Sequence, residues 1–342
     1  MSPIPIHVLS GFLGSGKTTL LNRLLRNPAF SSTAVIVNEI GEIGLDHFLI
    51  QRSSDNVVLL ESGCLCCTIV NSLHETLAHL DFQRVRGEIP AFERVIIETT
   101  GLAEPGPILN TLLGHPAVTQ SYRLERLVVT VDAQNAPSRI RVQPEIAKQI
   151  ALADSVVITK LDLVDDGGDV MALLDKLNST AERFDARSSD ASTHAFRSSA
   201  HRHLPAEPTI RFSQRAGSPG GRHGEHIRAH TLVLESAPSW AGIAAWWQIV
   251  RDSFGDRMLR CKGLIEIADG GDVVFIQAVQ RVFHKPERLD GWPDADHRSR
   301  LVCITSGIDE SELLRTLPAF ALPAGTPPGM TLADLDSNGR AT

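Results

Sequence analysis

Eight residues near the amino terminus have the types and spacing that hold phosphate groups. Residues 11–18 read GFLGSGKT, which matches G-x-x-x-x-G-K-[ST] between an apolar strand and a helix-forming run. Backbone N–H groups of such a loop turn toward phosphates, and the helix N-terminus adds its positive dipole end. Lys17 would contact the outer phosphates, and the Thr18 hydroxyl would ligate Mg²⁺. The expected phosphate-binding residues are Gly11, Gly14, Ser15, Gly16, Lys17, Thr18 and Thr19.

A second motif indicates which base the nucleotide carries. Residues 156–162 read VVITKLD, an apolar strand that ends in T-K-x-D. The Asp162 carboxylate can accept from N1–H and the 2-amino group of guanine, and adenine has neither donor. An unpaired buried carboxylate is costly, so this contact would discriminate strongly. We expect Thr159, Lys160 and Asp162 to bind guanine, with the Lys160 stem along the base and tying down the phosphate loop.

Two further loops are candidates for sensing the γ-phosphate. Residues 95–101 read VIIETTG, so Glu98 ends an apolar strand near the expected Mg²⁺ and Gly101 can offer its N–H to the γ-phosphate. GTPases more commonly have Asp at the position of Glu98. The polar loop 38–46, with two glycines, is the candidate first switch. Lys17, Thr18, Glu98 and Gly101 are the expected catalytic residues, and slow hydrolysis follows because no residue is evident to orient water.

Three cysteines form a C-x-C-C motif after a strand. Thiolates are soft ligands that suit Zn²⁺ or Cu(I), and three of them leave one tetrahedral position open. An open position suits a metal carrier better than a permanent structural site. Any one of these thiols could instead be a buried packing residue. The expected ligands are Cys64, Cys66 and Cys67, with Glu39, Glu42 or His115 as completing ligands.

Histidines cluster in a segment between the two halves of the chain. Neutral imidazoles there could collect borderline metals, or the segment could be a solvated polar linker. Its arginines indicate partner contact rather than nucleic-acid binding. The histidines are His194, His201, His203, His223, His226 and His230.

These motifs require elements that position them, and the first 160 residues supply a β/α alternation. Nearly continuous apolar strands separated by helices predict a mostly parallel sheet covered on both faces. The expected strands are 6–9, 34–38, 57–60, 94–98, 127–131 and 156–159, and the expected helices are 18–25, 70–80 and 144–151.

The second half predicts a smaller α+β domain. Its expected strands are 231–234, 259–267, 273–282 and 300–305, with a hairpin at 268–272 and helices at 239–254 and 310–316. We read Cys261 and Cys303 as packing residues of this domain. The predicted limits are 1–185 for the first domain, 186–228 for a His/Arg/Ser/Gly-rich linker, 229–320 for the second domain and 321–342 for a flexible tail.

Composition limits the function classes. The chain has 342 residues, 42% hydrophobic and 21% charged, with a formal net charge of −7. A mildly acidic chain is a poor general binder of nucleic acid or anionic membranes. No apolar run reaches the ~18 residues of a membrane span, the amino terminus lacks a signal-peptide pattern, and five cysteines are not a disulfide framework. We expect a cytoplasmic protein with reduced thiols.

The chain resembles the CobW-type metal-handling P-loop GTPases, whose relatives serve nickel insertion into hydrogenase and urease. The matching stretches are GFLGSGKTTLLNRLL, NEIGEIGLD, ESGCLCC, IIETTGLAEP and TKLDLV, with further likeness at 260–263, 279–284 and 298–301. Thr159 replaces the commoner Asn of the base motif. The resemblance implies a GTP-dependent metallochaperone that uses GTP, Mg²⁺ and Zn²⁺, with Co²⁺ or another divalent metal as alternatives. It also implies a metalloprotein client as partner, with a nucleotide-dependent homodimer as an option.

Our interpretation is a GTPase switch that couples nucleotide state to metal holding and delivery. One alternative is a metal buffer or sensor in which hydrolysis is incidental. Another is a small-molecule kinase that uses the P-loop with ATP, against which Asp162 argues. The client, the physiological metal and the direction of coupling are not readable from the residues.

Overall fold

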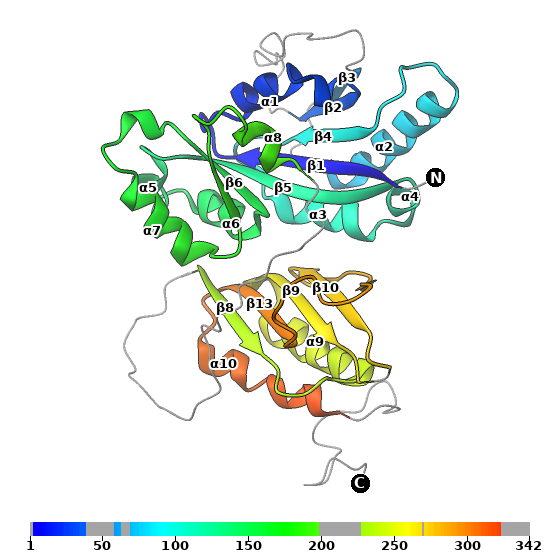
Figure 1. Ribbon diagram of the computed structural model, residues 1–342, viewed down its shortest axis with the longest axis vertical. Coiled ribbons are helices and arrows are strands. Elements are labelled where there is room, and N and C mark those ends of the chain that lie inside the picture. Colours follow the sequence, from blue (N-terminus) through cyan, green and yellow to red (C-terminus); the bar gives the residue numbers. More distant parts are fainter. Residues whose placement is uncertain (1–2, 39–57, 63–68, 198–226, 269, 323–342) are drawn as a thin grey trace. The chain divides into compact units, whose positions relative to one another are not determined.

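The computed structural model of the chain describes residues 3–38, 58–62, 69–197, 227–268 and 270–322 (Figure 1). It divides into two compact units, Met1–Ser199 and Ala200–Thr342. Within the described residues, no helix is both long and apolar enough to cross a membrane.

The first unit is an α/β domain built on a seven-stranded sheet with the order β3-β2-β4-β1-β5-β6-β7. Each neighbouring pair is parallel, which confirms the predicted P-loop-type fold. Six strands were expected; the seventh, β7, has the polar sequence ERFD and escapes an apolar pattern. The strands are β1 (Ile4–Gly11), β2 (Thr33–Asn38), β3 (Val58–Ser62), β4 (Arg94–Glu98), β5 (Tyr122–Asp132), β6 (Ser155–Thr159) and β7 (Glu182–Asp185).

Helices cover both faces of this sheet. Helices α1 and α8 lie on one face, and α3 and α6 lie on the other (Figure 1). The helices are α1 (Lys17–Leu25), α2 (Ile69–Val85), α3 (Pro105–Gly114), α4 (Pro116–Thr119), α5 (Ala136–Arg139), α6 (Pro144–Leu152), α7 (Gly168–Leu177) and α8 (Ala191–Ala195). Short 3₁₀ turns span Pro28–Phe30 and Leu161–Leu163.

The core under α1 corrects one predicted boundary. Leu21 and Leu24 of α1 are fully buried against apolar residues of the sheet, and Ala195 and Phe196 belong to the same cluster. Residues 191–196 were predicted in the linker, but α8 packs as part of the first unit. Their sequence, ASTHAF, is too short and polar to show a helical period, so only the packing reveals them.

The second unit is an antiparallel sheet with α9 (Trp240–Phe254) packed on it. Its strand order is β11-β10-β9-β13-β8, and β12 pairs with β10. This confirms the predicted α+β domain, whose first described strand, β8, starts at Ile227. The other elements are β8 (Ile227–Val233), β9 (Met258–Glu266), β10 (Val273–Val279), β11 (Val282–Phe283), β12 (Glu287–Arg288), β13 (Arg300–Ser306) and α10 (Glu310–Leu314), with 3₁₀ turns at Gly255–Arg257 and Leu317–Ala321.

One predicted strand is divided. Residues 273–282 were expected to be continuous, but β10 ends at Val279 because Gln280 adopts the left-handed conformation with φ of 51°. The predicted hairpin between β9 and β10 is confirmed, with Glu266 opposite Val273. At the far end, Leu322 is buried, so the second unit extends two residues into the predicted tail.

The core of the second unit centres on Trp246 of α9, which is fully buried. Its ring stacks on Phe320 with centroids 4.8 Å apart, and its indole N–H donates to Thr316 Oγ1 at 3.0 Å. Cys261 and Cys303 face each other across β9 and β13 with their sulfurs 3.6 Å apart. Both belong to this apolar cluster, which confirms their reading as packing residues.

Candidate nucleotide site

The loop between β1 and α1 has the backbone shape that its glycines predict. Gly16, which caps the N-terminus of α1, has φ of 94°, a left-handed conformation that disfavours other residues. A Cβ on Gly11 would lie 2.3 Å from Thr130 Oγ1, so only glycine allows this approach between β1 and β5. Ser15 is buried and its hydroxyl lies 2.6 Å from the Thr130 hydroxyl. The loop is therefore anchored on the neighbouring strand.

The charged and hydroxyl groups expected at the phosphates lie together on this loop. The Lys17 ammonium donates to the carbonyl oxygens of Gly11 at 2.9 Å and Phe12 at 3.4 Å. The Thr18 hydroxyl donates to Glu98 Oε1 at 2.9 Å. Glu98, at the end of β4, is only 5% exposed. Two residues 80 positions apart thus meet beside the loop, while Thr19 lies exposed in the first turn of α1.

The loop after β4 packs directly on the phosphate loop. A Cβ on Gly101 would lie 2.5 Å from the backbone nitrogen of Leu13. Buried Gln149 of α6 donates from its amide to the carbonyl oxygens of Gly101 at 3.0 Å and Ala103 at 3.1 Å. Gln149 was not predicted, because a single glutamine in an amphipathic helix gives no sequence signal. Its contacts fix the position of the Gly101 loop.

The T-K-x-D segment contacts the loop differently from expectation. Lys160 was expected to tie down the phosphate loop, but Thr159 does so, with its hydroxyl 2.8 Å from the Ser15 carbonyl oxygen. Lys160 has φ of 57°, which turns the chain sharply after β6. Its ammonium forms an ion pair with Asp132 at 2.6 Å. Asp162 lies exposed in the following 3₁₀ turn.

Asp132, at the end of β5, is a site residue that the sequence analysis did not select. Burial works to raise its pKa, but hydrogen bonds from Lys160 and Asn135 outweigh burial and hold the pKa below its usual range. Two backbone N–H groups, of Gln134 and Asn135, also donate to its carboxylate at 3.0 Å. An acid at the carboxyl end of a strand beside the T-K-x-D strand was the available signal. The ionised carboxylate holds Lys160 in place.

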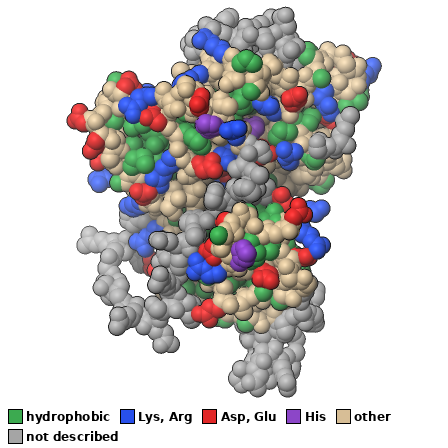
Figure 2. All heavy atoms as spheres, viewed as in Figure 1, with side chains coloured by type: hydrophobic (Ala, Val, Ile, Leu, Met, Phe, Trp, Pro, Cys, Tyr) green, Lys and Arg blue, Asp and Glu red, His purple; other side chains and the backbone are tan. Residues whose placement is uncertain are grey.

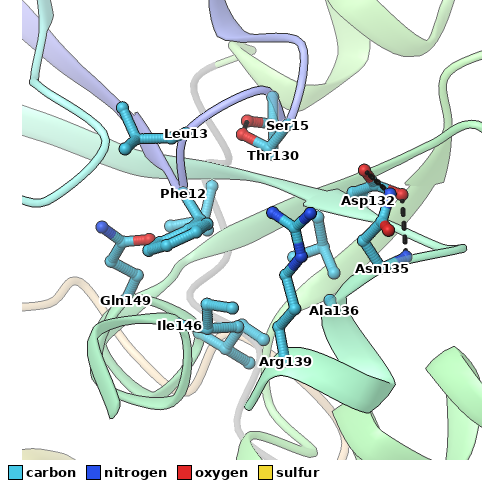
Figure 3. Close-up of a pocket in the computed structure, with 13 residues that line it drawn as sticks. Phe12, Leu13, Ser15, Thr130, Asp132, Asn135, Ala136, Arg139, Ile146 and Gln149 are labelled. Carbon is cyan, nitrogen blue, oxygen red and sulfur yellow. Dashed lines mark hydrogen bonds between the residues drawn. The ribbon is translucent and has the colours of Figure 1, made fainter. Parts of the chain in front are cut away.

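A small pocket lies behind the phosphate loop. Figure 3 shows the Ser15 and Thr130 hydroxyls side by side above it, with Phe12 on one side and the Asp132–Asn135 pair on the other. Arg139 extends from α5 into the space between them. The phosphate loop is therefore backed by polar and cationic groups as well as by α1.

The predicted metal ligands Cys64, Cys66, Cys67, Glu39 and Glu42 lie outside the described residues and stay predictions. Among the residues that are described, no group of three or more His, Cys, Asp or Glu side chains could hold a metal ion.

The described histidines differ in setting. His115 stacks on His74 with ring centroids 4.2 Å apart. His194, predicted in the linker, lies on α8, and His230, grouped with the same histidine cluster, lies on β8. His230 is buried, with Nε2 3.1 Å from the Thr305 hydroxyl, and is therefore a structural residue of the second unit.

Comparison with known proteins agrees with this geometry. A model of the "CobW/HypB/UreG, nucleotide-binding domain" family matches residues 5–186. The chain belongs to this family. A second model, "Cobalamin synthesis protein cobW C-terminal domain", matches residues 227–321, the second unit. The predicted family is thus confirmed, and the phosphate loop lies in its nucleotide-binding domain.

Relatives within and around the CobW/HypB/UreG family match to different extents. Zinc chaperone YjiA of Escherichia coli K12 is 28% identical over 319 residues, which cover 92% of this chain and 97% of YjiA. Zinc-regulated GTPase metalloprotein activator 1 of Schizosaccharomyces pombe is 33% identical over 171 residues, 48% of this chain and 40% of that protein. A crystal structure of Zn(II)-bound YjiA GTPase has a TM-score of 0.68 at 24% identity and covers 94% of this chain and 99% of that one, which shows a shared fold.

Proposed function

We propose that this protein is a GTPase that binds and slowly hydrolyses GTP, and that nucleotide state controls a Zn²⁺ ion carried at Cys64, Cys66 and Cys67 for delivery to a client protein in the cytoplasm. The observation that carries the proposal is the 2.9 Å hydrogen bond between Thr18 and Glu98. It joins the phosphate loop to the end of β4, three residues before Gly101. Loss of the γ-phosphate would therefore change the position of the loop that follows β4.

The residues at this junction fit a Mg²⁺ ion. Thr18 and Glu98 offer a hydroxyl and a carboxylate oxygen, the hard donors that Mg²⁺ prefers, and Mg²⁺ usually adds phosphate and water oxygens. When bound, Mg²⁺ would neutralise charge on the β- and γ-phosphates. Thr18 and Glu98 would hold it, with the Thr18 side chain oriented by the Glu98 carboxylate.

The remaining residues would bind and orient the nucleotide. Lys17 would move from the loop carbonyls to the phosphate oxygens, and the N-terminus of α1 would add its dipole. Gly101 would offer its N–H to the γ-phosphate, with its loop held by Gln149. Asp162 would accept from guanine N1–H and its 2-amino group. The Lys160 ammonium is paired with Asp132, and its stem would lie along the base.

Zinc enters the proposal as cargo. The names of the relatives associate zinc handling with this architecture. Three closely spaced thiols are soft ligands with one coordination position left over. Glu39 and Glu42 belong to the expected first switch, so a nucleotide-driven movement would change their distance from the thiolates. A metalloprotein client would then receive the ion.

The test measures nucleotide and metal binding on the same full-length chain. Equilibrium binding of GTP, GDP and ATP, with phosphate release assayed separately, should give GTP selectivity and slow turnover. Lys17→Ala should abolish triphosphate binding or turnover, because it removes the positive charge that would contact the transferring phosphate. Lys176→Ala, an exposed lysine of α7, is the matched control. Metal content by elemental analysis, with GTP, GDP or no nucleotide, completes the measurement.

Each alternative function has its own outcome. Equal binding of ATP and GTP would contradict the guanine assignment and favour the small-molecule kinase. Metal binding that ignores the nucleotide would leave a metal buffer with incidental hydrolysis. An increase in hydrolysis on addition of a client would support delivery.

A further inference from the structure

A second cavity lies in the first unit, away from the phosphate loop. It has a volume of about 500 Å³ and opens on the face of the sheet that carries α1 and α8. Pro5 and His7 of β1, Arg94 of β4 and Glu125 of β5 line it near the amino ends of their strands. Gly11 lies four positions after His7 along β1, a distance on the order of 13 Å. The cavity is therefore distinct from the expected nucleotide site.

His7 is unusual at its position. Its neighbours on the central strand β1, Ile6, Val8 and Leu9, are apolar and fully buried, and His7 itself is only 3% exposed. Its ring packs against Phe196 with centroids 5.5 Å apart, and its Nδ1 has no hydrogen-bond partner within the described part of the chain. A buried polar group usually costs free energy unless it is hydrogen-bonded. Packing alone would be better served by a leucine at this position.

Charged groups of both signs surround this ring. Burial is the largest cause and lowers the pKa of His7 to about 4. Of the nearby charges, Glu125 has the largest effect and raises the pKa, while Arg94, Arg126 and Arg123 lower it. His7 is therefore a neutral imidazole at pH 7.

Arginines outnumber acids in the wall of the cavity. Three arginines, Arg94, Arg123 and Arg197, line it against two acids, Glu125 and Asp190. Arg123 pairs with Glu125 at 3.1 Å, and Arg94 has a longer contact of 3.9 Å with Glu93, which lies outside the lining. Arg94 lies over the Phe30 ring at 4.5 Å and donates to the Ala29 carbonyl oxygen at 2.6 Å, so its guanidinium is held at the cavity. Figure 2 shows blue, purple and red side chains mixed on the visible face of the first unit.

We propose that this cavity is a second ligand site that binds a small organic anion, a phosphate or carboxylate group on an apolar body. Arg94 and Arg197 would pair with the anionic group, and neutral His7 would hydrogen-bond to the ligand. Phe30 and Phe196 supply apolar wall, and the volume is within the ~300–1,000 Å³ of small-molecule pockets. A metal ion fits less well, because the described residues hold no cluster of three metal ligands.

The test follows the histidine resonances of the full-length chain by NMR, with Mg²⁺ and GDP present so that phosphate probes do not report on the P-loop. The probes are phenyl phosphate, benzoate and inorganic phosphate, with benzyl alcohol as the neutral control. Phenyl phosphate or benzoate should shift the His7 signals in a saturable way and raise the His7 pKa by roughly one unit, because an added negative charge favours the imidazolium. Tighter binding of phenyl phosphate would identify the anionic group as a phosphate, and tighter binding of benzoate would identify it as a carboxylate.

Variants separate this site from a general charge effect. Arg94→Gln should weaken binding of the better probe about tenfold or more, as expected for loss of a charged hydrogen bond. Arg197→Gln, at an exposed position, tests the same cavity without disturbing the core. Arg298→Gln, an exposed arginine of the second unit, is the control. GDP affinity should be unchanged in all three.

Several results would overturn the proposal. No saturable His7 shift with any probe, or wild-type binding in both cavity variants, would exclude an anion site. Inorganic phosphate that binds as tightly as phenyl phosphate would exclude the apolar body. Equal shifts from benzyl alcohol would show that charge is not recognised.

Discussion

At the scale of single residues, base selectivity is predicted to depend on one carboxylate. Asp162 lies exposed in the turn after Lys160, where guanine could reach it. Asp162→Ala should weaken GTP binding by at least about 10- to 100-fold, the value of a single hydrogen bond to a charged group, because two such bonds to guanine are lost. It should also remove the preference over ATP. Competition binding with both nucleotides measures this. Asp165→Ala, an exposed acid three residues away, should change neither affinity.

A second prediction at the residue scale concerns pH. The folded protein keeps His7 neutral down to about pH 4, whereas the unfolded chain binds this proton below its ordinary pKa of 6.5. Stability should therefore fall as the pH is lowered from about 6.5 to 4, by up to about 3 kcal/mol from this group. Denaturant unfolding of wild type and His7→Leu across this range isolates the effect. Parallel curves for the two proteins would contradict it.

At the scale of elements, the loop after β4 is predicted to act through close packing on the phosphate loop. Gly101→Ala places a methyl group against the backbone of Leu13. A side chain could rotate away from this methyl group, but the backbone cannot. The loop must move outward, so affinity for a non-hydrolysable GTP analogue should fall by about tenfold or more while GDP affinity is kept, because only the triphosphate needs the Gly101 N–H. Gly291→Ala, with open space around it, is the control. Equal losses for both nucleotides would indicate general misfolding instead.

The strand pair β9–β13 gives a prediction about thiol reactivity. The neighbouring Cys303 thiol and then burial raise the pKa of Cys261 well above its usual value. The thiolate is the form that reacts with iodoacetamide. We therefore expect Cys261 and Cys303 of the native protein to be modified on the order of 100-fold more slowly than in denaturant, because reaction requires unfolding of the second unit. Peptide mapping by mass spectrometry after timed alkylation follows each cysteine separately. Rapid labelling of either one in the native protein would show that this core opens.

At the scale of the whole molecule, metal and nucleotide are predicted to be coupled. If a carboxylate of the first switch enters or leaves the zinc site with nucleotide state, zinc affinity should differ between the GTP- and GDP-bound forms by roughly 5- to 150-fold. Chelator competition with a non-hydrolysable analogue and with GDP measures the ratio. Cys64→Ser, Cys66→Ser and Cys67→Ser combined should remove this zinc and leave GDP binding intact. Identical zinc affinities in the two states would contradict a switch.

The sequence alone determined what depends on neighbouring residues. The phosphate loop, the T-K-x-D turn, six strands of the first sheet and the hairpin of the second unit were readable because local spacing and apolar period dictate them. The family followed from the same contiguous motifs. The thiolate cluster stays a prediction from spacing.

Only the tertiary structure decided which distant groups meet. Thr159 reaches Ser15 across 144 positions, Gln149 reaches Gly101 across 48, and Lys160 pairs with Asp132 across 28. The order of strands in the sheet brings these partners together, and that order cannot be predicted from single polar residues in the sequence. Short or polar elements such as β7 and α8 were missed because their residues follow no apolar period and are held by packing. The cavity around His7 depends on three strands and α8 together, so only the folded chain reveals it.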